Sequence, residues 1–217
     1  MKKLSIALLL VAWPLLIAVA GPAQADNEMG LYTEPTGQVN STSNNVGPGT
    51  PFDLFLVVTN PVNEAYIDGA GTPPYVRPMT GVSGFECRIM FWDNSGAALP
   101  GLSVLNTTFN GDAIRLGDGN EFVVGFAEPV PVVSAAAVLA TFSLMAMDNN
   151  DKPIYLGLTA NSSIPGALAI VDGSIETDNL QAVAPSSGDL ANPVFIINIG
   201  GLATETEKWG NVKALYR

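Results

Sequence analysis

Apolar and polar side chains alternate along short stretches of this chain, and this period-two pattern constrains its fold more than any other feature. The clearest stretch runs from Phe85 to Trp92. One face of an extended strand there would hold the apolar side chains Phe85, Cys87, Ile89 and Phe91. The opposite face would hold Glu86, Arg88, Met90 and Trp92. The pattern predicts a half-buried β-strand.

Further strands are predicted wherever similar runs end at Gly, Pro, Asn or Asp. They are Phe52 to Thr59, Leu102 to Phe109, Glu121 to Ala127, Val138 to Met147, Ile154 to Ala160, Leu168 to Val171 and Val194 to Ile199. A sheet with one apolar face must bury that face against another layer. About eight strands without an amphipathic helix between them therefore predict an all-β fold, an antiparallel β-sandwich such as a jelly roll.

Two segments depart from this rhythm. Residues 61 to 80 contain four prolines and no alternation, so we expect a long surface loop there. Residues 204 to 207 read Thr-Glu-Thr-Glu, which has the form of a helix capping box. Apolar side chains recur after it at three-residue spacing, so a short C-terminal helix is predicted.

The first 25 residues have the pattern of a secretory signal peptide. Lys2 and Lys3 precede an apolar run from Leu4 to Ala20, and Ala23-Gln24-Ala25 gives a small-x-small cleavage pattern before Asp26. The alternative is a retained membrane anchor, but the run is short for crossing a bilayer. We therefore expect a signal peptide at 1–25, a β-sandwich at 26–201, a helical tail at 202–217, and a secreted or cell-surface bacterial protein.

Composition excludes several kinds of chemistry. The chain has no His and one Cys, so catalytic triads, His-ligated zinc and an internal disulfide are ruled out. It has 20 acidic against 9 basic residues, and this balance disfavours nucleic acid as a partner. Cys87 lies in an apolar strand face, where we expect a small buried hydrophobe and not a nucleophile.

Three aromatic side chains are the candidate ligand-binding residues. Trp92 lies on the more polar face of its strand, and the proline-rich segment contains Tyr66 and Tyr75. Together they could form a strip that stacks on a sugar ring, although the same side chains could serve only to cover the strand. No cofactor is expected. Asp148 and Asp151 offer oxygen ligands for calcium, but they match no spaced calcium-loop pattern, so solvated turns are the favoured interpretation.

The C-terminal tail differs in charge from the rest of the chain. Its basic residues are Lys208, Lys213 and Arg217, whereas residues 26 to 207 contain four basic residues and all 20 acidic ones. The tail could contact the acidic body of another copy, act as an export or anchoring tag, or dock as a helix on its own domain. The candidate partner-binding residues are Trp209, Val212, Lys213, Leu215, Tyr216 and Arg217.

The segment Gly81-Val82-Ser83-Gly84-Phe85-Glu86-Cys87, which leads an alternating strand to Asp93, resembles secreted sandwiches of the cohesin and carbohydrate-binding-module type. The runs Glu121 to Phe126 and Val138 to Leu144 extend the resemblance, which covers roughly Gly49 to Ala160. The whole chain also resembles uncharacterised exported bacterial proteins that share the tail W-G-x-V-K-x-L-Y-R. The resemblance implies export and a β-sandwich, and it assigns no binding residue.

Three functions are consistent with the sequence. The first is a non-catalytic secreted domain for adhesion, scaffolding or self-assembly, with a cell-surface protein or another copy as partner. The second is a carbohydrate-binding module that binds polysaccharide through Trp92, Tyr66 and Tyr75. The third is a glycoside hydrolase built on paired carboxylates, for which the sequence offers no identifiable pair.

Overall fold

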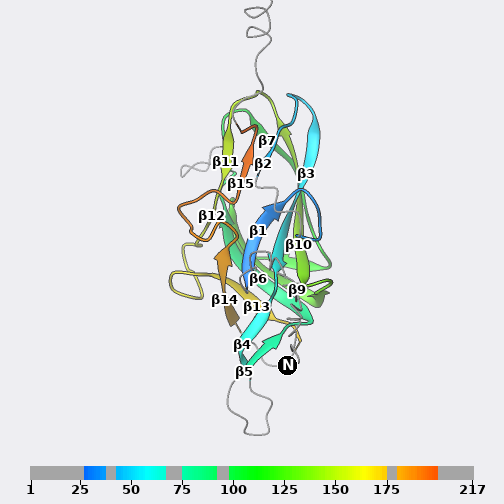
Figure 1. The fold of residues 1–217 in the computed structure, drawn as a ribbon, viewed down its shortest axis with the longest axis vertical. Coiled ribbons are helices and arrows are strands. Elements are labelled where there is room, and N and C mark those ends of the chain that lie inside the picture. Colours follow the sequence, from blue (N-terminus) through cyan, green and yellow to red (C-terminus); the bar gives the residue numbers. More distant parts are fainter. Residues whose placement is uncertain (1–26, 38–42, 67–74, 92–97, 175–179, 200–217) are drawn as a thin grey trace, which may run out of the picture.

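The computed structural model describes residues 27–37, 43–66, 75–91, 98–174 and 180–199, and these residues form strands and no helix (Figure 1). The strands, in chain order, are β1 (Glu28–Tyr32), β2 (Ser43–Asn44), β3 (Pro51–Thr59), β4 (Val62–Tyr66), β5 (Tyr75–Pro78), β6 (Gly81–Ile89), β7 (Leu102–Phe109), β8 (Ala113–Arg115), β9 (Glu121–Pro131), β10 (Ala136–Ala146), β11 (Lys152–Ile154), β12 (Leu156–Gly157), β13 (Leu168–Asp172), β14 (Leu180–Pro185) and β15 (Phe195–Ile197). The predicted all-β class is confirmed.

The main sheet is one continuous path of hydrogen-bonded strands in the order β7-β10-β3-β1-β14-β13-β6-β9-β8, with β12 added to β6. Most neighbours are antiparallel, but β1 pairs in parallel with β14. The expectation of two separate antiparallel sheets therefore needs a correction. Because β1 pairs with β3 on one side and β14 on the other, it joins the two layers of the sandwich along one edge.

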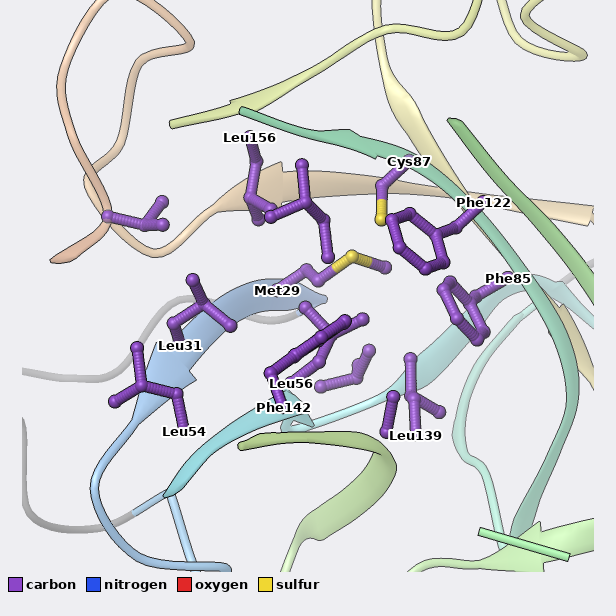
Figure 2. Packing of buried hydrophobic residues seen from close by; sticks show 14 of the residues in the cluster. Met29, Leu31, Leu54, Leu56, Phe85, Cys87, Phe122, Leu139, Phe142 and Leu156 are labelled. Atoms are coloured by element: carbon purple, nitrogen blue, oxygen red, sulfur yellow. The ribbon is translucent and has the colours of Figure 1, made fainter. Parts of the chain in front are cut away.

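The two halves of this path face each other across an apolar core. The ring of Phe142 on β10 lies 5.6 Å from that of Phe122 on β9, although these strands are far apart in the strand order. It also lies 5.0 Å from the ring of Phe91, which follows β6. Figure 2 shows Met29 between these layers, with Leu56 and Phe142 on one side and Cys87 and Phe122 on the other. Each of these side chains is at most 1% exposed.

The alternation that predicts β6 corresponds to the observed burial. The four apolar side chains of the predicted strand are between 0% and 3% exposed and belong to the core: Phe85, Cys87, Ile89 and Phe91. Full burial of a large apolar side chain stabilises a fold by roughly 1.5–3 kcal/mol. The strand itself ends at Ile89, and Trp92 lies outside the described residues.

The prediction of a structureless loop at residues 61–80 is wrong at both of its ends. There β4 and β5 pair antiparallel, with Val62 opposite Pro78 and Tyr66 opposite Tyr75. A proline cannot donate a backbone hydrogen bond, so it fits best at the ends of a strand. Here Pro61 precedes β4 and Pro78 ends β5, which leaves the interior of both strands free to pair.

The strand predicted at 154–160 is also wrong in its extent. The chain changes partner at Tyr155: β11 before it pairs with β15, whereas β12 after it pairs with β6. One period-two run therefore serves two different sheets. The strands β2 and β8 were not predicted, because two or three residues are too few to show a period. The strands β1 and β14, with five and six residues, were missed as well.

Candidate binding groove

A groove of about 490 Å³ lies along β14. Four stretches of chain line it: the start of β1, the middle of β4, the segment before β13, and β14 with the loop after it. The lining residues are Asn27, Glu64, Gly166, Ala167, Leu168, Ala182, Val183, Ala184, Pro185, Gly188, Asp189 and Leu190.

The alternation of β14 explains the small side chains in the groove. Gln181, Val183 and Pro185 are buried, whereas Ala182 and Ala184 are exposed. Alternate residues of a strand point to opposite faces, so these two alanines lie on the solvent face. A methyl group fills little space, so the groove remains open where β14 passes through it.

Asn27 connects the start of β1 to this groove. Its backbone has φ of 54°, a left-handed conformation that asparagine tolerates better than most residues. Its Oδ1 accepts a 2.7 Å hydrogen bond from the backbone N–H of Val62, and its carbonyl accepts one of 2.9 Å from Ala184. Asn27 is only 3% exposed, yet its Nδ2 is buried with no hydrogen-bond partner among the described residues. An unpaired buried donor costs about 1–3 kcal/mol.

A buried polar network holds Glu64 at the groove. The Glu64 backbone N–H donates a 3.0 Å hydrogen bond to Oε1 of Gln181. Nε2 of Gln181 donates to Oδ1 of Asn63 at 3.1 Å, and Nδ2 of Asn63 donates to Oδ2 of Asp172 at 2.9 Å. Because Asn63, Asp172 and Gln181 are almost fully buried, these bonds fix β4 against β13 and β14. The Glu64 side chain is exposed.

The loop after β14 supplies the second carboxylate, that of Asp189. Oδ1 of Asp189 accepts a 2.9 Å hydrogen bond from the backbone N–H of Ala191. Its backbone carbonyl accepts bonds from Oγ of Ser187 at 2.9 Å and from the N–H of Asn192 at 3.0 Å. The loop therefore holds its shape through local bonds and presents an exposed Asp189.

A second hollow of about 370 Å³ adjoins the first, and Leu190 lines both. Arg88 and Met90 line it from the outer side of β6, with Tyr155 to Leu158 opposite them. The Met90 backbone N–H donates to the carbonyl of Tyr155 at 2.9 Å. Nε of Arg88 is buried without a hydrogen-bond partner among the described residues.

The outer face of β6 is covered more fully than its sequence indicates. Glu86 is only 6% exposed, because the segment from Thr159 to Ser163 folds over it. Its carboxylate accepts hydrogen bonds from the Thr159 hydroxyl and from the Ser163 backbone N–H. Burial alone would raise the pKa of Glu86, but the hydrogen bonds from Ser163 and Thr159 outweigh it and hold the pKa below its usual value.

The predicted binding residues are placed only in part. Tyr66 and Tyr75 lie opposite each other in the β4–β5 pair, and nothing is described of their side chains. Trp92 lies outside the described residues, as does the whole tail with Trp209, Val212, Lys213, Leu215, Tyr216 and Arg217. The aromatic strip and the tail therefore remain predictions.

Cys87 is 0% exposed, and burial first, with the nearby Glu86 charge second, raises the pKa of its thiol far above the ordinary value. Its predicted place among the core side chains is confirmed.

The proposed calcium ligand Asp148 has a cationic partner within the chain. Its Oδ1 lies 2.5 Å from Nζ of Lys152, a side chain that is only 3% exposed. The hydrogen bond from Lys152 lowers the pKa of Asp148. Within the described ranges no group of three or more His, Cys, Asp or Glu side chains is placed to hold a metal ion. No helix in the described part is long and apolar enough to span a membrane.

The groove was not predicted from the sequence. Its two carboxylates lie 125 residues apart, Glu64 at residue 64 and Asp189 at residue 189, and neither belongs to a motif. The one local signal was the pair of alanines at alternate positions in Leu180–Pro185, which a search for strands of only six residues could have found.

No protein-family model matches the chain, and no curated protein matches it in sequence. Two solved structures are similar in fold. One is the cohesin module from a family 33 glycoside hydrolase of Clostridium perfringens, with 8% identity, a TM-score of 0.35, and coverage of 73% of this chain and 97% of that one. The other is a type II cohesin domain from the cellulosome of Acetivibrio cellulolyticus, with 12% identity, a TM-score of 0.38, and coverage of 82% and 98%.

Proposed function

We propose that this chain is an exported, non-catalytic β-sandwich that acts outside the cell or at its surface by self-assembly. In this proposal the signal peptide at residues 1–25 directs export. The body, residues 26–201, provides an acidic surface, and the tail, residues 202–217, links one copy to the next. Adhesion to, or scaffolding of, another surface protein would use the same kind of contact.

The observation that supports this proposal is that two of the few basic side chains in residues 26–201 make contacts within the domain. The ammonium group of Lys152 is buried against Asp148. The guanidinium of Arg115 lies 4.1 Å from the ring centroid of Phe122 and donates hydrogen bonds to the carbonyls of Gly119 and Glu121. These two cations are engaged inside the domain, whereas the tail adds three more at Lys208, Lys213 and Arg217. Opposite charges on two parts of one chain favour association between copies.

The test is the size of the secreted chain in solution, measured by size-exclusion chromatography with light scattering. We expect the chain to associate at low salt, and deletion of residues 204–217 to give a folded monomer by circular dichroism. The matched control keeps the length of the tail and replaces Lys208, Lys213 and Arg217 with Gln, which should weaken the association. An equal mass with and without the tail would reject self-assembly.

Carbohydrate binding is the second candidate, and the register of β4 and β5 favours it. Tyr66 and Tyr75 pair directly across these two strands, so two aromatic residues are close in space. Two neighbouring rings could stack on successive sugars. Retention on insoluble polysaccharides that falls in Trp92→Ala and in Tyr66→Ala would support this function, and no retention of the unchanged chain would remove it.

A further inference from the structure

The β14 groove is suited to a basic, partly apolar segment of chain. Its charged lining residues in the described part are two carboxylates, those of Glu64 and Asp189, and both are exposed. Between them Ala182 and Ala184 leave room for a larger side chain. A ligand with separated cations and apolar groups between them would meet both features.

An unpaired donor is the second, independent sign of a ligand. Asn27 lines the groove and is 3% exposed, and its Nδ2 has no hydrogen-bond partner among the described residues. Its Oδ1 is already occupied by the backbone N–H of Val62. The missing partner is therefore an acceptor.

The chain's own C-terminal residues 208–217 have this chemistry. The segment contains Lys208, Lys213 and Arg217 and no acidic residue, and its apolar side chains are Trp209, Val212 and Leu215. The described chain ends at Ile199, just after β15, which Figure 1 places further along the long axis of the molecule than β14.

We propose that the β14 groove of one copy binds residues 208–217 of a second copy, with the cations at Glu64 and Asp189 and an apolar side chain over Ala182 and Ala184. This inference rests on the proposed self-assembly and names its acceptor site. Because the groove and the tail are different surfaces, the contact is head-to-tail and can continue from copy to copy.

The experiment uses the full secreted chain and two groove variants, with association followed by light scattering at low salt. Removal of both carboxylates in Glu64→Gln/Asp189→Asn should weaken association about fivefold, the loss expected for two exposed ion pairs. Ala182→Arg, which fills the groove and adds a positive charge, should abolish it. The matched control is Glu128→Gln/Asp112→Asn, which removes two exposed carboxylates that do not line the groove and should associate like the unchanged chain.

A synthetic peptide of residues 208–217 should compete with association of the unchanged chain, and a scrambled peptide of equal charge should compete less. If deletion of the tail abolishes association while both groove variants assemble normally, the groove is the wrong acceptor and self-assembly stands. If deletion of the tail changes nothing, the proposed function itself fails. Binding of the peptide to a chain that lacks its own tail, together with loss of that binding in Ala182→Arg, would identify the groove and support the inference.

Discussion

Phe142 is the side chain on which the packing of the two layers depends most directly. It is fully buried on β10, and its ring makes edge-to-face contacts with Phe91 at 5.0 Å and with Phe122 at 5.6 Å. Truncation of a buried Phe to Ala costs about 3–5 kcal/mol. Loss of two aromatic contacts, each about 0.5–1.5 kcal/mol, puts Phe142→Ala near the upper end of that range. Since a domain of this kind has about 5–15 kcal/mol of stability, such a loss would remove about a third of it or more.

Urea denaturation followed by circular dichroism measures this free energy. Phe142→Leu refills much of the cavity but loses both aromatic contacts, so it should cost about 1–3 kcal/mol and less than Phe142→Ala. The surface control Leu116→Ala, at a side chain that is 77% exposed, should stay within about 0.5 kcal/mol of the unchanged protein. A loss below about 1.5 kcal/mol in Phe142→Ala would show that the two layers do not meet at this ring.

Three further predictions concern single contacts. The pKa of the Glu86 carboxylate is lowered in the fold, so this group should add stability above pH 4.5 that is lost as the pH falls through its pKa in the folded state. The urea midpoints of the unchanged protein and of Glu86→Gln should therefore differ near neutrality and converge in acid. Parallel pH profiles of the two midpoints would contradict this. A Cβ at Gly30 would lie 2.2 Å from Oγ and 2.7 Å from Cβ of Ser186, so Gly30→Ala should cost about 1–3 kcal/mol, and Ser186→Gly in the same chain should recover most of it. The Cys87 thiol should not react with a disulfide reagent at pH 8 until denaturant is added, and rapid labelling of the native protein would show that it is not buried.

The sequence predicts the parts of the fold that local periodicity determines. Leu102–Phe109 has the predicted bounds, and Pro51–Thr59 differs from its prediction by one residue. Both are long enough to show alternation above chance. The strand Glu28–Tyr32 has five residues and little polar contrast, because four of the five are buried and neither face of the strand meets water freely.

The site is less predictable, because its features come from tertiary contacts. Glu86 falls on the polar face of its strand in the sequence pattern, which predicts a solvent-facing side chain. Its burial depends on the distant residues Thr159 and Ser163, which donate hydrogen bonds to it. The prolines of residues 61–80 suggest a loop, yet the buried Asn63 pairs with Asp172 more than a hundred residues away and holds β4 in place. No local pattern in a sequence encodes such a partner.

Mixing two defective chains tests head-to-tail assembly most directly. One chain has an intact groove and lacks residues 204–217, and the other has an intact tail and Ala182→Arg in the groove. Each alone should be a monomer in light scattering, and the mixture should form a one-to-one pair and nothing larger, because only one contact remains possible. Monomers in the mixture, under conditions in which the unchanged chain associates, would contradict the assignment of tail to groove.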